Sequence, residues 1–245
     1  MAAKPDKSRA GDKARAKRGG GRVAIPRPKR PRPPKQPRSS EDGPYHHGAL
    51  RDALLQAAER VLERDGLGGL TLRAVAREAG VSHAAPTHHF GDLTGLLSEL
   101  AAIGFRQFNA AMAQACVDRL PAEKPMSRAK AYVGYAQAHP GMYGLMFRTE
   151  RLDYSRPSLH AAAEASFAGL AGAVAASRHE KFEGDALSLD QAAAIARGWS
   201  LVHGFTMLLL DGRLSDILRR SPSGTTAESL LDAMLKLAMG RPRVD

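Results

Sequence analysis

The sequence predicts an all-α fold, and two observations support this prediction. From about Gly48 onward, apolar residues recur at every third or fourth position, the period of an amphipathic helix, as Leu50, Leu54 and Ala57 illustrate. Short linkers rich in Pro, Gly or Ser separate these periodic segments, and no strands alternate with them. We therefore expect an N-terminal three-helix domain, joined by a long helix to a C-terminal helical domain.

The first helix is expected to run from about Gly48 to the stretch DGLGGL, where Gly66 and its neighbours end it. Thr71 is a suitable N-cap for a second, short helix, LRAVAREAG, because its hydroxyl can accept a hydrogen bond from a free backbone N–H. Gly80 ends this helix, and its freedom to adopt a left-handed backbone suits the tight turn that follows.

A third, short helix should be capped by Ser82 and close at Phe90, and Asp92 should open a long helix that runs toward Cys116. After Pro121 the helical pattern continues in further segments. These segments cover residues 127–140, 141–147, 158–180, 190–212 and 226–240.

The positive charge of the chain is concentrated at its N-terminus. Of the 36 Lys and Arg residues behind the formal net charge of +11, 14 lie in residues 1–40 beside only two Asp, so the remainder is nearly neutral. Residues 1–43 offer almost no large apolar side chain, and we expect this Pro-, Arg- and Lys-rich tail to be disordered. Such a tail can bind an anionic polymer such as DNA, and the alternative is that it only keeps the protein in solution.

Several features favour a cytoplasmic protein. Cys116 is the only cysteine, which excludes an intrachain disulfide and suits a reducing compartment. The N-terminus lacks the apolar core of a secretion signal, and no stretch reaches roughly 18 uninterrupted apolar residues, so we expect no membrane span. The sequence also lacks the Gly-x-Ser-x-Gly and phosphate-cradling motifs, and we expect neither an enzyme nor a cofactor.

Residues 71–90 follow the order helix, tight turn, helix, which is the spacing of a helix-turn-helix motif. In that motif the N-terminal part of the second helix enters the major groove of DNA. The histidines of VSHAAPTHHF are poorly placed to bind a metal, because His83 and His88 stand roughly 140° apart around a helix. No Cys, Asp or Glu between Val81 and Gly91 completes a site, so we expect no metal.

The stretch ALRDALLQAAERVLERDGLGGLTLRAVAREAGVSHAAPTHHFGDLTGLL resembles the DNA-binding domain of TetR-family transcriptional repressors. The matching elements are the Ala-rich first helix, GLGGLTLRAVAREAGVS, the HHF that ends the recognition helix, and the GDLTGLL that opens the fourth helix. The segments AYVGYAQAHPGMYGLMF and WSLVHGF look like the effector-binding half of one TetR subgroup, which has a Trp, a His and a Gly close together as in Trp199, His203 and Gly204. The resemblance implies a DNA-binding domain at 48–108 and an effector-binding and dimerisation domain at 109–241.

The resemblance further implies a homodimer that places two recognition helices in a near-palindromic operator on double-stranded DNA. A small-molecule effector, expected to be mostly apolar, would release the operator. The segments 191–210 and 226–238 would form the dimer interface as a four-helix bundle, which their wide apolar faces support. Activation instead of repression stays open.

Carried over position by position, the resemblance implies that Thr71 and Arg73 contact phosphates together with the N-terminus of the second helix. The residues that would face base edges begin the recognition helix: Ser82, His83, Ala84 and Ala85. The residues one turn further, which could reach phosphate or base, are Thr87 and His88. His89 and Phe90 are expected to pack.

Two positions depart from the family pattern. Thr87 stands where the family mostly has Tyr, and Leu93 stands where it mostly has Lys or Arg. Both replacements remove contacts to the DNA backbone. We hypothesise that the basic tail compensates by contacting phosphates itself. Each such contact would add about −0.9 to the slope of log K for DNA binding against log salt concentration. The alternative function is a non-specific, nucleoid-associated protein that coats DNA without sequence preference.

Candidates for the effector pocket are the large apolar or aromatic residues of the C-terminal half: Phe105, Phe108, Met112, Tyr143, Met146, Phe147, Trp199, His203 and Met207. Taken one at a time, each is also explained by ordinary core packing. Trp199 and His203 are the better candidates, because they lie one turn apart on one face and a histidine offers a polar group inside an apolar cavity.

Overall fold

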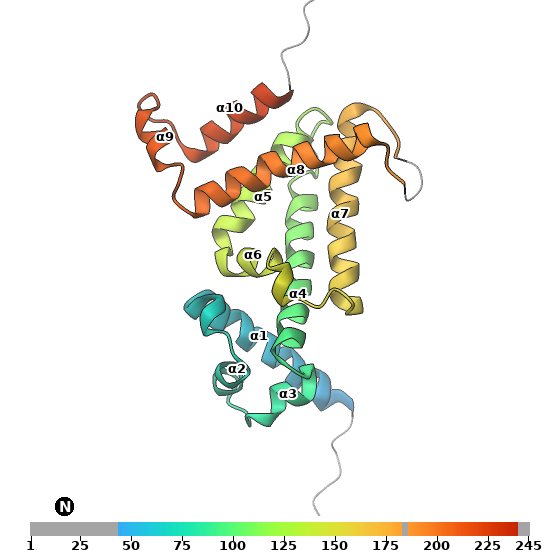
Figure 1. Ribbon diagram of the computed structural model, residues 1–245, viewed down its shortest axis with the longest axis vertical. Coiled ribbons are helices and arrows are strands. Elements are labelled where there is room, and N and C mark those ends of the chain that lie inside the picture. The colour runs from blue at the N-terminus through green and yellow to red at the C-terminus, as the bar shows by residue number, and fades with distance from the viewer. Residues whose placement is uncertain (1–43, 183–185, 240–245) are drawn as a thin grey trace, which may run out of the picture. The chain divides into compact units, whose positions relative to one another are not determined.

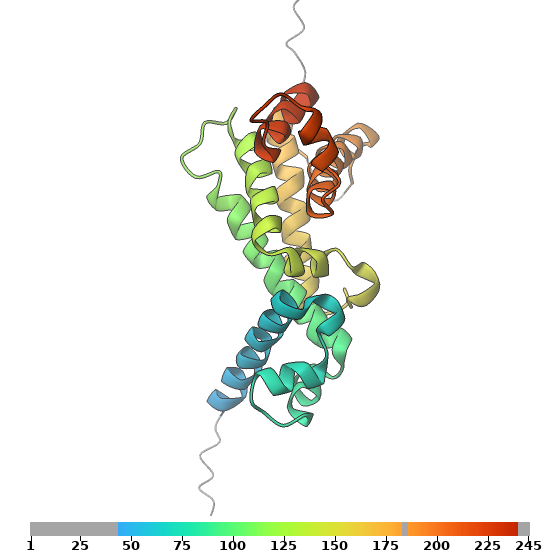
Figure 2. The same cartoon turned by 90° about the vertical axis from the view of Figure 1, so that its left-hand side faces the viewer.

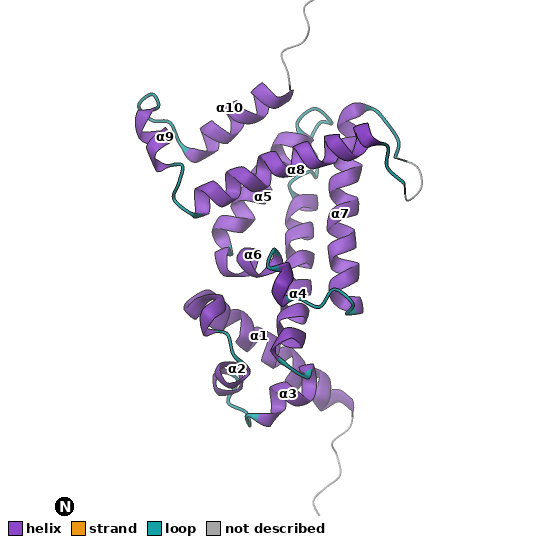
Figure 3. Ribbon diagram, in the orientation of Figure 1, coloured by secondary structure: helices purple, strands orange, loops and turns teal. Residues whose placement is uncertain are grey.

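The computed structural model describes residues 44–182 and 186–239, and every regular element within these ranges is a helix (Figures 1 and 3). The N-terminal helices are α1 (Pro44–Gly69), α2 (Leu72–Glu78), α3 (Ala84–Phe90) and α4 (Leu93–Gln114). The helices that follow are α5 (Lys124–Ala138), α6 (Pro140–Met146), η1 (Thr149–Arg151), α7 (Pro157–Arg178), α8 (Leu189–Leu210), α9 (Ser215–Arg220) and α10 (Ala227–Met239). The all-α prediction is confirmed, and the tail predicted to be disordered lies outside the described residues.

The helix ends around the helix-turn-helix form largely as predicted. Thr71 Oγ1 accepts a hydrogen bond at 3.1 Å from a backbone N–H in the first turn of α2, and Asp92 Oδ1 accepts one at 2.7 Å at the start of α4. Gly80 adopts a φ of +69°, the left-handed conformation that the turn requires. The predicted Ser82 cap is wrong: α3 begins after His83, which makes no side-chain capping bond.

Some local features were not predicted. α1 extends to Gly69, although Gly66, with φ 69° and ψ −179°, interrupts its helical geometry. The short helices η1 and α9 were also missed. Elements of three and six residues are too short to show a hydrophobic period, so their sequences could not be distinguished from loops.

The long helix α4 is the centre of the core. It packs most extensively against α7 and also contacts α1, α5 and α6. One apolar cluster runs continuously from Leu54 in α1 through Phe90 in α3 to Leu159 in α7. The domain boundary predicted at 108/109 falls inside α4, so the helix-turn-helix and the helices packed on α4 share this cluster. A second cluster joins α5, α8 and α10 through Val133, Phe205, Leu231 and Leu235.

α7 and α8 expose much of their apolar surface. By length and composition alone both could cross a membrane, with mean hydropathies of 1.2 and 1.3 over 18-residue windows, and 17% of each window is buried. This is weak evidence for a span, because only two of the described helices meet these criteria and helices of soluble proteins can meet them too. α8, drawn in orange, lies far from the helix-turn-helix (Figures 1 and 2). It leaves Trp199 and Leu208 45% and 43% exposed. The described chain therefore does not cover its own apolar surface on this helix.

Candidate DNA interface and effector site

α2 and α3 form the predicted helix-turn-helix (Figure 1). The turn between them is closed by a hydrogen bond of 3.0 Å from Val81 N to Ala76 O. α2 buries a face of small side chains that includes Val75 and Ala76, and α3 buries Pro86 and Phe90. Small side chains on α2 let the two helices approach closely, which leaves the opposite face of α3 free for another molecule.

The residues predicted to contact DNA share an outward position. Seven of them are exposed: Thr71, Arg73, Ser82, His83, Ala84, Thr87 and His88. Ala85 is half-buried. Phe90 is 2% exposed and packs in the core, with the half-buried His89 ring 6.3 Å from its own. Their contacts with DNA stay a prediction.

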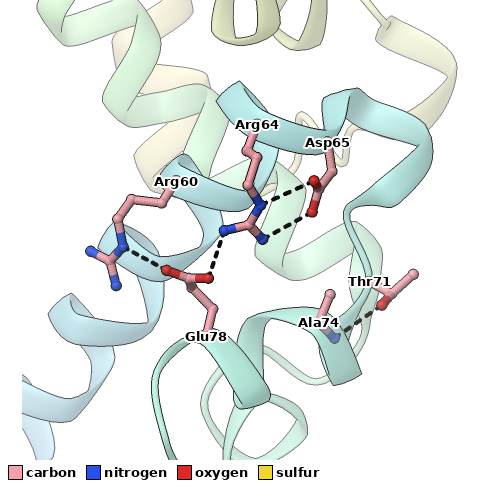
Figure 4. A network of polar contacts seen from close by, with 6 residues as sticks. All are labelled: Arg60, Arg64, Asp65, Thr71, Ala74 and Glu78. Atoms are coloured by element: carbon pink, nitrogen blue, oxygen red, sulfur yellow. Dashed lines mark hydrogen bonds and ion pairs between the residues drawn. The ribbon is translucent and has the colours of Figure 1, made fainter.

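An ion-pair network holds α2 against α1 (Figure 4). The Glu78 carboxylate accepts from Arg60 Nε and from Arg64 Nη1, each at 2.9 Å, and Arg64 also forms a two-bond pair with Asp65. The hydrogen bonds from Arg60 and Arg64 lower the pKa of Glu78, and those to Asp65 and Glu78 raise the pKa of Arg64. The network is exposed, so it contributes modestly to stability but fixes the orientation of α2. Its sequence signal, two arginines at i and i+4, was overlooked.

The structure brings four of the predicted pocket residues together: Tyr143, Phe147, Trp199 and His203. The ring of Phe147 lies 4.7 Å from that of His203, and the ring of Trp199 lies 6.0 Å from His203 and 6.5 Å from Phe147. The other candidates except Met207 are buried in the core: Phe105, Phe108, Met112 and Met146. Met207 is 39% exposed on α8.

Two tyrosine hydroxyls converge on His203. Tyr132 Oη and Tyr143 Oη lie 2.9 and 2.8 Å from Nδ1, and Tyr143 donates to Tyr132 at 3.1 Å. Burial raises the pKa of both tyrosines and lowers the pKa of His203. The hydroxyls therefore keep their protons. With Tyr143 donating to Tyr132, the Tyr132 hydroxyl is left to donate to Nδ1 in the imidazole tautomer that has this nitrogen unprotonated. We name Phe147, Trp199, His203, Tyr132 and Tyr143 the aromatic cluster.

Tyr132 was missed in the sequence. It lies on α5, its hydroxyl meets a histidine 71 positions later, and nothing in AYVGYAQAHP marks it above the neighbouring Tyr135. Tyr135 instead donates to the carbonyl oxygen of Gly104 on α4, at 3.2 Å. Only the helix packing distinguishes the two tyrosines.

Two surface grooves lie outside the aromatic cluster. An open groove of 590 Å³ beside α1 is lined by Gln56, Glu59, Arg60, Glu63 and Arg64. A groove of 330 Å³ between α7 and α8 is lined by Val174, Ser177, Arg178, Asp190, Ala193, Ala194, Arg197 and Gly198. Neither contains a predicted pocket residue. Among residues 44–182 and 186–239, no group of three or more His, Cys, Asp or Glu side chains could hold a metal ion.

We predict that stability falls between pH 7 and pH 5 more steeply in the wild-type chain than in His203→Gln. Because burial lowers the pKa of folded His203, the unfolded chain, with a pKa of about 6.5 for this residue, takes up the proton first as the pH falls. Protonation therefore favours the unfolded state. Urea unfolding at pH 5, 6 and 7 measures the two slopes. The exposed His160→Gln is the control and should follow the wild type. Equal slopes for all three proteins would contradict a half-buried His203 that stays neutral.

Two family models match the chain. Residues 54–100 match bacterial regulatory proteins of the tetR family, and residues 126–234 match a tetracyclin repressor-like C-terminal domain. The HTH-type transcriptional regulator YobS of Bacillus subtilis is 27% identical over 96 residues, which is 39% of this chain and 50% of that protein. An HTH-type transcriptional regulator of Mycobacterium tuberculosis is 26% identical over 194 residues, 79% of this chain and 82% of that protein.

Solved structures agree with these matches. A protein of unknown function from Rhodococcus sp. RHA1 is 34% identical, with a TM-score of 0.62 and coverage of 78% of this chain and 94% of that one. A tetR family transcription regulator from Shewanella sp. PV-4 shares the fold at 18% identity, with a TM-score of 0.55 and coverage of 77% and 97%. The chain belongs to the TetR family and is a DNA-binding transcriptional regulator, not an enzyme.

Proposed function

We propose that the protein is a homodimeric repressor that a small, largely apolar ligand releases from a near-palindromic operator in the cytoplasm. Residues 48–108 would bind DNA, and residues 109–241 would bind the ligand and the second subunit. The observation that carries this proposal is the exposed face at the start of α3, flanked by the exposed Thr71 and Arg73 at the start of α2. A two-fold dimer would place two such faces about 34 Å apart, the repeat of the major groove.

The apolar surface of α8 supports a dimer. This helix is as apolar as α7 and equally little buried, and Leu208 and Met207 are exposed on it. Large exposed apolar surfaces on soluble proteins mark interaction sites, and most homo-oligomers are two-fold dimers. We propose that α8 and α10 pack against the same helices of a second copy.

The aromatic cluster supports a ligand that carries an acceptor on an otherwise apolar body. In the neutral tautomer of His203 whose Nδ1 accepts from tyrosine, the ring proton is on Nε2, which can donate to an oxygen of the ligand. Phe147 and Trp199 supply aromatic surface beside it. Neither of the two grooves includes these residues, and we propose that the ligand enters by displacing the two rings.

Two substitutions distinguish a residue that recognises a DNA base from a residue that contacts the DNA phosphates. His83→Ala should reduce specificity at one base position, with a loss of about 1–3 kcal/mol against the preferred base. Arg73→Ala should weaken binding to all DNA sequences alike and reduce the salt slope by about one phosphate contact. Fluorescence anisotropy with matched and mismatched duplexes at several salt concentrations measures both. Identical effects of the two variants on all duplexes would contradict the assigned roles.

A gel shift with competitor DNA tests the function. A repressor should bind a palindrome near its own gene at least about 1,000-fold more tightly than random duplex, with two chains per site. A protein that coats DNA would show nearly equal affinities, and this result would favour the nucleoid-associated alternative.

A further inference from the structure

The connection between α6 and α7, residues 147–156, reaches the recognition helix. Arg156, the residue before α7, donates from Nη2 to the carbonyl oxygen of Phe90 at 3.2 Å. Phe90 is the last residue of α3, and carbonyls in the last turn of a helix have no partner within it. A guanidinium here satisfies such a carbonyl and stabilises the negative end of the helix dipole.

Neighbouring contacts fix this connection on the DNA-binding half of α4. Asp153 N donates to Ser98 Oγ at 2.8 Å, and Ser98 is fully buried. Ser158 Oγ donates to Glu99 Oε1 at 2.8 Å, and the same carboxylate pairs with Arg51 of α1 at 2.6 Å. The residues around Arg156 are thus tied to both α4 and α1.

The position of Arg156 is tightly defined. A Cβ on Gly95 would lie 2.5 Å from Arg156 Nη2, so the guanidinium lies in space that any larger residue at position 95 would enter. Its Nε is buried, 3.6 Å from Asp153 Oδ2. On the other side, the guanidinium of Arg51 lies 5.5 Å above the Phe90 ring. Phe90 is therefore held at its ring by α1 and at its carbonyl by the connection.

The other end of the connection belongs to the aromatic cluster. Phe147 begins it and lies 4.7 Å from the ring of His203. Leu152, 9% exposed, anchors the middle of the connection in the core. One continuous segment therefore joins the aromatic cluster to the end of the recognition helix.

We propose that Arg156 is a positioning residue for DNA reading, and that residues 147–156 transmit the state of the aromatic cluster to the end of α3. The second part rests on the proposed function, in which that cluster receives the ligand. A ligand that displaces Phe147 draws Arg156 away from Phe90 and loosens α3, so it binds better to the DNA-incompetent state. By linkage, operator binding alters the surroundings of Trp199.

Hydrogen exchange of the full chain, without DNA or ligand, tests the positioning role. Peptides covering 84–95 should exchange about tenfold faster in Arg156→Gln, because a hydrogen bond from a charged donor is lost. Arg156→Lys, which can still donate to Phe90, should restore protection. Arg148→Gln, on the same connection but 62% exposed, is the control and should match the wild type. Exchange in Arg156→Gln equal to that of the wild type overturns the positioning role.

Fluorescence tests the transmission, because Trp199 is the only tryptophan. Saturation with the operator should change Trp199 emission in the wild type and in Arg156→Lys, and this change should be lost in Arg156→Gln at saturating DNA. An equal change in Arg156→Gln, or none in the wild type, overturns the transmission. If no DNA is bound specifically, the proposed function fails instead, and the exchange experiment still decides the role of Arg156.

Discussion

Gly95→Ala is expected to lower the free energy of unfolding by about 3 kcal/mol, a large share of the stability of a typical domain. A Cβ at this position would lie 2.1 Å from the carbonyl oxygen of Phe90 and 2.5 Å from Arg156 Nη2. A flexible side chain can move aside, but the backbone oxygen moves only if the turn between α3 and α4 shifts. That shift would also strain the cap that Asp92 forms on Gly95 N. Urea unfolding measures the loss.

Gly134→Ala is the matched control. Gly134 is also within a helix, but it is exposed and a Cβ there would meet nothing within 4 Å. Alanine is the better helix former by about 1 kcal/mol, so this variant should be neutral or more stable. Equal unfolding midpoints for the two variants would show that the space at Gly95 is not restricted.

Leu208→Glu is expected to weaken dimerisation by roughly 100-fold or more, and operator affinity with it. In the proposed two-fold dimer, each subunit would bury one new carboxylate in the apolar interface. Burying an unpaired charge costs free energy, so the dimer is destabilised. Leu208 is 43% exposed in the single chain, so the substitution should leave the fold intact. Analytical ultracentrifugation gives the dimer dissociation constant, and anisotropy gives the operator affinity.

Leu120→Glu is the control for that experiment. Leu120 is 67% exposed, lies in the connection between α4 and α5, and is part of neither α8 nor α10. It should dimerise and bind DNA like the wild type. If Leu208→Glu behaves in the same way, α8 does not form the interface.

The helix-turn-helix was predictable because its signals are local. A cap at Thr71, a left-handed glycine at Gly80 and a cap at Asp92 each act within four residues, so their sequence pattern is sufficient. The predicted cap at Ser82 does not form, because α3 begins one residue later, after His83. Helix ends commonly shift by this amount.

The C-terminal site was only partly predictable, because its contacts join distant segments. Trp199 and His203 were recognised from their spacing on one helix, but the contact of Tyr132 with His203 depends on how α5 packs against α8. Arg156 was missed for the same reason: its partner, Phe90, lies 66 positions earlier. The apolar face of each helix can be predicted from a single sequence, but the pairs of faces that pack together cannot.

Selection of bound sites from random DNA tests the central claim most directly. If the protein is a dimer that reads DNA through two α3 helices, the selected sites should share a two-fold symmetric consensus, with half-sites about one helical turn apart. His83→Ala should change the consensus at the same position in both halves. A pool without a consensus, or an unsymmetrical single half-site, would contradict the account.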